Sequence, residues 1–415
     1  MALDIMLFVG RIDVFRQEGI EAILDKVQGA GIQSLLLGDL VIDGSPAFEP
    51  QLDYYSGIPT APPRVTEAAR PKVEAFRHAV QRAKERGLKL YLHDWGQGMA
   101  MSQTCLNDRE ALGYGLARTR DARRAYPQID GYVLDGPEFG YEIEPGHRSD
   151  LFGCFCDKCL EKAKRDGFDV VSMRQGRDWL KDALGRIDAV SAHHWLQGEL
   201  SATDVLDLLV AQPGLFEWFR FKSHSIVELL SAYRDCIKGM DEKLAIACGP
   251  RISAFAPLTG YNYRLIGDIV DFLCPKVYLW QRGIDGLKGT VGRYASTLMA
   301  WNPTLSESLA LSLVCKAFGI PLPGVESLGD LDSPLSPEFF VHTLPSEIDK
   351  AIARTGDASK LRFLMGLHHG GVHMSTDEMR EILIAIEQSP CDKVLYWEYG
   401  DITEEQWKVL RDFAR

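Results

Sequence analysis

Apolar and polar positions follow two alternating periods along the chain, one typical of buried strands and one typical of helices. Short apolar runs predict eight strands, at residues 3–9, 32–38, 88–93, 129–134, 243–248, 272–280, 361–367 and 393–397. Apolar residues at three- and four-residue spacing predict helices at residues 19–30, 71–86, 108–126, 261–270, 291–300, 306–318, 375–388 and from 403 onward. Because strands and helices alternate, the pattern favours an α/β fold of the (β/α)8 TIM-barrel type.

Two stretches interrupt this alternation. Residues 148–240 read as several helices without a clear strand, which predicts a helical insertion after the fourth strand, and the last of these helices, at residues 218–237, is expected to complete the barrel. Residues 43–64 form a loop rich in Pro, Gly and Tyr, and so long a loop is usually functional. We predict a single barrel domain over residues 1–415. A doubly wound open sheet is the alternative, and the lack of a Gly-rich phosphate turn after the first strand counts against it.

Composition and charge exclude some classes of protein. The chain has 415 residues, of which 46% are hydrophobic and 25% charged, as is usual for globular proteins. A formal net charge of −12 argues against sequence-independent nucleic-acid binding. The first apolar run is too short for an export signal, and no run approaches the length of a membrane span. Nine cysteines, several of them isolated, indicate a reducing compartment, so we expect a cytoplasmic protein. A homo-oligomer remains open.

Four of the cysteines form a pattern that suggests a metal site. Cys154, Cys156 and Cys159 have C-x-C-x2-C spacing, which places three thiols on one short loop. Zinc prefers four ligands in a tetrahedron, and Cys105 can supply the fourth if its loop lies beside the cluster. The alternative is that all four are ordinary reduced cysteines, buried as small apolar side chains. We expect a structural Zn²⁺ and no organic cofactor.

The C-terminal ends of the strands carry the candidate catalytic residues, because barrel enzymes place their chemistry where strands end. Glu138 follows the fourth strand, and an apolar surround or the neighbouring Asp135 would let it act as a general acid. Its alternative role is to cap a helix or pair with an arginine. Glu398 follows the aromatic eighth strand and is the candidate second carboxylate, unless it forms a structural salt bridge with Arg251. The expected substrate contacts are Asp39, His93, Asp94, Trp95, Asp135, Arg251, Tyr278, Trp280, His368 and Trp397.

The region from Cys105 to about residue 195 resembles the glycoside hydrolase family 42 β-galactosidases. The shared features are the lone Cys105 opening a helix, the strand end Pro137-Glu138-Phe139-Gly140, the C-x-C-x2-C cluster at residues 154–159, and a Gly-Phe-Asp turn followed by Trp179-Leu180. The resemblance covers under a third of the chain. It implies a TIM-barrel glycosidase, with Glu138 as acid/base and a structural zinc on the four cysteines.

The chain departs from this family in two places. Pro137 stands where the family has an asparagine that contacts the sugar, and the seventh strand, which carries the family's nucleophile, offers no carboxylate. The chain therefore looks like a divergent, barrel-only relative that cleaves an O-glycosidic bond of a carbohydrate, with Glu398 as the second group. Because the fourth and eighth strands face each other across a barrel, we expect wide carboxylate spacing and inversion if both act.

Two other functions remain open. One is a non-catalytic carbohydrate-binding barrel that lacks the usual nucleophile. The other is a metal-dependent hydrolase that uses the histidines near the strand ends, namely His93, His368, His369 and His373, with Asp94. The absence of a His-x-His pair on the first strand counts against this second alternative.

Overall fold

Nine of the strands form one parallel sheet that curls into a barrel-like fold. The computed structural model describes residues 2–42, 44–95, 105–143, 150–198, 201–280, 283, 285–366 and 373–414. The nine strands run in the order β8-β7-β6-β5-β2-β1-β11-β10-β9, and every pairing between them is parallel. Their bounds are β1 Asp4–Val9, β2 Ser34–Asp39, β5 Lys89–Asp94, β6 Gly131–Asp135, β7 Ala245–Gly249, β8 Phe272–Leu273, β9 Lys276–Val277, β10 Phe363–Gly366 and β11 Lys393–Trp397.

The two ends of the sheet, β8 and β9, belong to one interrupted stretch of chain. The sequence predicted a single strand at residues 272–280, and this is wrong. Pro275 lies between β8 and β9 and has no N–H to donate to a strand ladder. The backbone N–H of Cys274 on one side and of Lys276 on the other still reach the neighbouring segment, at 2.8 and 3.0 Å. Parallel bridges Arg251–Lys276 and Leu273–Leu361 carry the pairing past the interruption.

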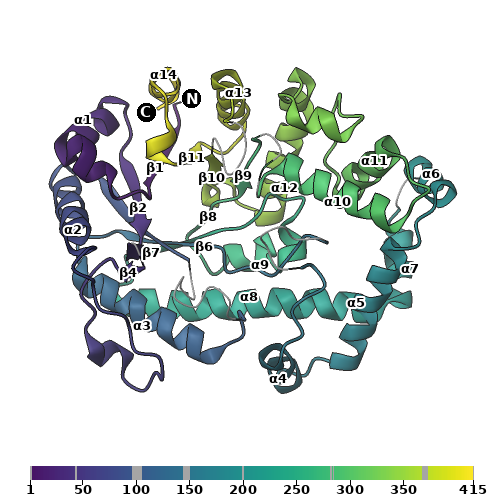
Figure 1. The fold of residues 1–415 in the computed structure, drawn as a ribbon, viewed down its shortest axis with the longest axis horizontal. Coiled ribbons are helices and arrows are strands. Elements are labelled where there is room, and N and C mark those ends of the chain that lie inside the picture. The colour runs from purple at the N-terminus through teal and green to yellow at the C-terminus, as the bar shows by residue number, and fades with distance from the viewer. Residues whose placement is uncertain are drawn as a thin grey trace.

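Helices surround the strands (Figure 1). They are α1 Ile20–Gly29, α2 Arg70–Glu85, α3 Arg109–Ala125, α4 Asp157–Arg165, α5 Val170–Leu184, α6 Ala189–Gln197, α7 Ala202–Ala211, α8 Pro213–Met240, α9 Tyr263–Gly267, α10 Leu287–Trp301, α11 Glu307–Phe318, α12 Leu344–Thr355, α13 Thr376–Glu387 and α14 Glu404–Phe413. Five of them, α4 to α8, lie between β6 and β7. The two ends of the chain lie together beside α14, where the N–H of Leu3 donates to the carbonyl of Phe413 at 2.7 Å.

Three features of the fold were not expected from the sequence. A small hairpin, β3 Val41–Ile42 with β4 Ser45–Pro46, lies in and beside the loop predicted at residues 43–64. Helix α12 was not predicted at all, and the helix predicted at 261–270 is only the short α9. Among the helices of the described residues, none combines the length and the apolar character that crossing a membrane requires.

Strand alternation decides which side chains enter the barrel mouth. Successive side chains of a strand point to opposite faces. On β5, His93 therefore points into the barrel and the next residue, Asp94, points outward to the helices. The barrel interior is a separate apolar cluster that contains Met6, Phe8, Leu36, Val133, Ala247, Cys274, Tyr278, Trp280, Leu364 and Leu395. Asp135 lies two residues beyond Val133 and Gly249 two beyond Ala247, on the same inward face. Since Gly249 has no side chain, Asp135 has room: a Cβ there would lie 3.0 Å from Asp135 Oδ1.

Candidate active site at the barrel mouth

Four charged side chains from four strands cross the mouth of the barrel. His93, at the end of β5, contacts Asp39 through Nδ1, and its Nε2 lies 3.5 Å from Asp135 Oδ2. Asp135 ends β6 and pairs with Lys276 on β9, with 2.6 Å between Nζ and Oδ1. A register shift at the end of β2 brings Asp39 opposite His93, where it also accepts from Trp95 Nε1 at 2.9 Å. The sequence-predicted Asp39, His93, Trp95 and Asp135 are thus brought together.

Asp39, His93, Asp135 and Lys276 form a charged row, and their mutual attraction opposes the effect of burial on the pKa values of His93 and Asp135. Burial favours the neutral form of His93, but the carboxylates of Asp39 and Asp135 outweigh it and raise the pKa of His93 to about 9. Burial alone would raise the pKa of Asp135, yet the Lys276 ammonium and His93 hold that pKa far below its ordinary value. At neutral pH the row therefore carries an imidazolium between two carboxylates, and Asp135 is ionised.

Glu398 presents the opposite case. It follows β11, is only 4% exposed, and accepts a hydrogen bond from the N–H of Gly10 at 3.0 Å. Burial raises the pKa of its carboxyl to about 7, against weaker effects of the Gly400 N–H and the Arg11 guanidinium. The backbone can come this close because residue 10 is glycine: a Cβ there would lie 2.6 Å from Glu398 Oε2. Glu398 thus holds a proton that it can release near neutral pH.

Glu138 is bound by an arginine. Its carboxylate accepts from Arg251 Nε at 3.0 and 3.1 Å and from Nη2 at 2.5 Å, and both side chains are at most 4% exposed. The same guanidinium lies 2.9 Å from Asp285 and over the ring of Tyr141. A guanidinium favours the charged form of a carboxylate, so this arrangement does not favour Glu138 as a proton donor. The sequence considered Arg251 as a partner of Glu398, whereas the structure pairs it with Glu138.

The four aromatic residues predicted to bind sugar divide into two pairs. Trp95 and Trp397 are partly exposed, and both rings meet His93 edge to face, with centroids 5.4 and 5.2 Å away. Tyr278 and Trp280 are 7% and 2% exposed and stack on each other inside the barrel. Trp95 and Trp397 are therefore the rings with surface available to a ligand.

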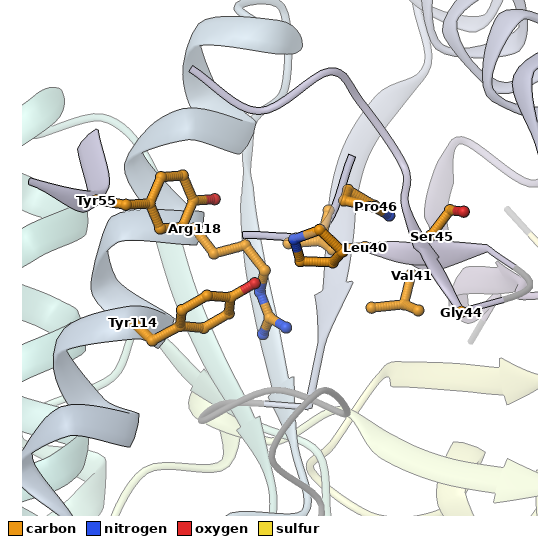
Figure 2. A pocket seen from close by; sticks show the side chains of 9 residues that line it. Leu40, Val41, Gly44, Ser45, Pro46, Tyr55, Tyr114 and Arg118 are labelled. Atoms are coloured by element: carbon orange, nitrogen blue, oxygen red, sulfur yellow. The ribbon is translucent and has the colours of Figure 1, made fainter. Parts of the chain in front are cut away.

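Asp94 does not join this group. Asp94 points to the outer face of β5, where it is buried against Arg118 of α3. Figure 2 shows Arg118 reaching from α3 beside Tyr114 toward a pocket of about 170 Å³ that Leu40 helps to line. Asp94 therefore joins β5 to helix α3 through its ion pair with Arg118. His368, with His369, lies outside the described residues.

Sequence reasoning missed two charged members of the mouth, Lys276 and Asp285. Lys276 had a usable signal, since it is the one charged residue in the apolar run Phe272-Leu-Cys-Pro-Lys-Val-Tyr-Leu-Trp280. A lone charge on the inward face of a barrel strand needs a buried partner, and Asp135 is that partner. Asp285 had no comparable signal, because it lies in a loop and meets Arg251 only through the fold.

The four predicted metal-binding cysteines lie together at the start of α3 and α4. Their sulfurs all lie within 4.8 Å of one another, and the Cys105 and Cys159 sulfurs are 3.2 Å apart. Zn–S bonds of about 2.3 Å in a tetrahedron place sulfurs about 3.8 Å apart, so the arrangement fits a zinc ion. Asn107 adds its backbone N–H to Cys105 and its side-chain amide to Cys159, at 3.4 and 3.3 Å.

A second group of potential metal ligands lies away from the barrel mouth. Within the parts of the chain that the structure describes, one other group of His and acidic residues is compact enough for a metal: Asp166, His224 and Glu228. It lies on α8 and at the end of α4, away from the strand ends, and Lys162 already ion-pairs with both of its carboxylates. The ammonium group of Lys162 therefore supplies the positive charge beside these two carboxylates.

Comparisons with known proteins show the fold. No sequence-family model matches the chain, and no curated protein matches it. The structure is similar to the glycoside hydrolase domain of PgaB (BpsB) from Bordetella bronchiseptica, with a TM-score of 0.55 and 10% identity over 99% of both chains. It is also similar to a β-galactosidase from the psychrophilic Marinomonas ef1, with a TM-score of 0.55 and 12% identity over 99% of this chain and 58% of that one. These similarities place the chain in a barrel fold that glycoside hydrolases use.

Proposed function

We propose that this protein is a glycoside hydrolase built on a (β/α)8 barrel with a helical insertion at residues 148–240, in which β8 and β9 together form the sixth strand. Its substrate is a carbohydrate with an O-glycosidic bond. Trp95 and Trp397 provide aromatic faces for a sugar ring, and Asp39, whose side chain is 28% exposed, provides a carboxylate for its hydroxyls.

The observation that carries this proposal is the contrast between two carboxyl groups of one barrel. Glycoside hydrolysis needs a protonated carboxylic acid for the leaving oxygen and an ionised carboxylate on the other side of the sugar. Burial gives Glu398 a pKa of about 7, while Lys276 and His93 keep Asp135 ionised. Groups whose environments push their pKa values apart in this way are the usual acid and base of such a site.

The roles follow from these charges. Glu398 donates its proton to the leaving oxygen, and Asp135 acts as the base that activates a water. Asp135 ends β6, the fourth strand of the barrel, and Glu398 follows β11, the eighth. These two strands face each other across an eight-stranded barrel, which leaves room for a water between the carboxyl groups, so we propose inversion at the anomeric carbon. Glu138, the first candidate from the sequence, becomes a positioning residue that holds Arg251.

A non-catalytic sugar-binding barrel is the second candidate function. The pairing of Glu138 with Arg251 favours it, because the acid/base position of the resembled family is occupied by an ion pair. The two functions differ in one measurable respect, which is whether a bound glycoside is cleaved.

The test is hydrolysis of a panel of aryl glycosides by the full chain and three matched variants, Glu398→Gln, Asp135→Asn and Glu138→Gln. We expect Glu398→Gln and Asp135→Asn each to lower kcat by at least about a hundredfold, because each removes a proton carrier or a charge used in the transition state. Glu138→Gln should affect activity less. NMR of the first-formed anomer then reports inversion or retention.

Each outcome separates the assignments. A large loss in Glu138→Gln with little change in Glu398→Gln would return the acid role to Glu138. Sugar binding without cleavage of any glycoside in the panel would leave the binding barrel as the function.

We also propose that Cys105, Cys154, Cys156 and Cys159 hold a structural Zn²⁺. The compact sulfurs and the Asn107 donors support this. Elemental analysis of the purified protein should give about one zinc per chain, and Cys156→Ser should lose it and melt at lower temperature. The matched control is Cys236→Ser, a cysteine outside the cluster. Absence of zinc from protein purified without chelator would contradict the proposal.

A further inference from the structure

A pocket between three outer helices has a charge opposite to that of the protein. The pocket has a volume of about 680 Å³ and lies where α8, α9 and α12 meet. Arg220 of α8, Arg264 of α9 and Arg354 of α12 all line it, although the chain carries a net charge of −12. A volume of this size is typical of small-molecule sites.

The three arginines are only weakly neutralised by carboxylates. Among the residues that the structure describes, neither Arg264 nor Arg354 has a carboxylate within ion-pair distance, and Arg354 donates instead to the carbonyl of Ser253. Arg220 lies 3.8 Å from Glu217, and that carboxylate also accepts the backbone N–H of Asp169 at 3.0 Å. Guanidinium groups bind carboxylates and phosphates through paired hydrogen bonds, so positive charge gathered in a concave site favours an oxyanion.

The remaining lining suits a ring. Phe219, Tyr261, Tyr263 and Pro257 supply apolar faces. Tyr261 and Tyr263 are only 1% and 2% exposed, so Phe219 and Pro257 offer most of the apolar surface that a ligand can reach.

We propose that this pocket is a second binding site, separate from the barrel mouth, for a ring compound that carries an oxyanion. Acidic sugars and sugar phosphates share this chemistry. One residue that lines the pocket also contacts a residue of the barrel mouth: the hydroxyl of Tyr263 donates a hydrogen bond to the backbone carbonyl of Arg251 at 2.5 Å. The site would let an acidic carbohydrate bind to the enzyme independently of cleavage.

Isothermal titration calorimetry on the full chain at low salt tests this proposal. The probes are trigalacturonic acid as the carboxylate source and glucose 6-phosphate as the phosphate source, with neutral maltotriose and inorganic phosphate as comparators. We expect one of the two acidic ring compounds to bind at least tenfold more tightly than either comparator, and binding to weaken as salt is added. No binding of either acidic compound would overturn the site, and equal binding of inorganic phosphate would overturn its preference for a ring.

The variants locate the ligand. The double substitution Arg220→Ala with Arg264→Ala should weaken binding at least tenfold, whereas Arg186→Ala, in the exposed turn after α5 and ion-paired with Asp182, should leave it unchanged. An equal loss in Arg186→Ala, or full binding by the double variant, would overturn the assignment. Glu398→Gln should bind normally, so failure of the proposed hydrolysis would not be mistaken for failure of this site.

Discussion

The ends of β6 and β11 place the same kind of group, a buried carboxyl, in two different surroundings. Asp135 at the end of β6 lies among charges, with Lys276 at 2.6 Å and His93 at 3.5 Å. Glu398 after β11 accepts hydrogen bonds from backbone N–H groups, that of Gly10 at 3.0 Å and that of Gly400 at 3.5 Å. One carboxyl is therefore ionised at neutral pH and the other retains a proton over part of the same range. Burial raises the pKa of a carboxyl, as at Glu398, unless neighbouring positive charges outweigh it, as at Asp135.

Removing the charge partner on the β6 side should have the largest effect. Lys276→Met keeps the length of the side chain but leaves the Asp135 carboxylate buried with only His93 opposite. Breaking a buried ion pair by removing one partner usually costs about 3–5 kcal/mol, and we expect a loss of that order in urea unfolding at pH 7. The double variant Lys276→Met with Asp135→Asn should recover part of the loss, because no buried charge is then left alone. If Lys276→Met unfolds like the wild type, the two side chains are not coupled as the structure shows.

The β11 side should respond in the opposite direction. The folded pKa of Glu398 is raised from 4.5 to about 7, so the wild type loses stability as pH rises through this interval. Glu398→Gln escapes that loss, and we expect it to be more stable at pH 8 by on the order of 3 kcal/mol and equal to the wild type near pH 4. Unfolding curves at the two pH values measure this. A variant that is less stable at pH 8 would show that Glu398 is charged in the folded protein and stabilised there.

The positions of the two carboxyls in the fold could be predicted from the sequence. The periodicity predicted the strands that carry both carboxyls, and the barrel rule placed Asp135 and Glu398 at strand ends. Two of the errors arose where a proline interrupted or began an element. Pro275 divides the sixth strand into β8 and β9, and Pro345 stands in the first turn of α12, a helix that followed a Pro- and Gly-rich stretch and was not predicted. In both places the proline indicated a break in secondary structure, although the folded chain forms β9 after Pro275 and α12 around Pro345.

The pairings within the site could not be predicted. Sequence spacing predicted that the four cysteines lie together, because three of them fall within residues 154–159, but it gave no means of choosing between Glu138 and Glu398 as the partner of Arg251. That choice depends on how the loops after β6 and β7 meet, where the N–H of Phe139 donates to the carbonyl of Thr259 at 3.1 Å. The contrast between the two carboxyls is therefore a product of tertiary structure.

The smallest expected effect concerns the outer member of the charged row, Asp39. Its side chain is 28% exposed, so its contribution is screened by solvent more than that of Asp135. His93 has a folded pKa of about 9, raised from 6.5, so its protonation stabilises the fold below pH 6.5 and this stabilisation is lost as pH rises toward 9. Asp39→Asn removes one of the two carboxylates opposite the imidazole. We expect the pKa of His93, followed by NMR, to fall, and stability to drop by about 1 kcal/mol at pH 6 but not at pH 10. A stability difference that stays constant with pH would mean that Asp39 acts through packing and the Trp95 hydrogen bond rather than through the charge of His93.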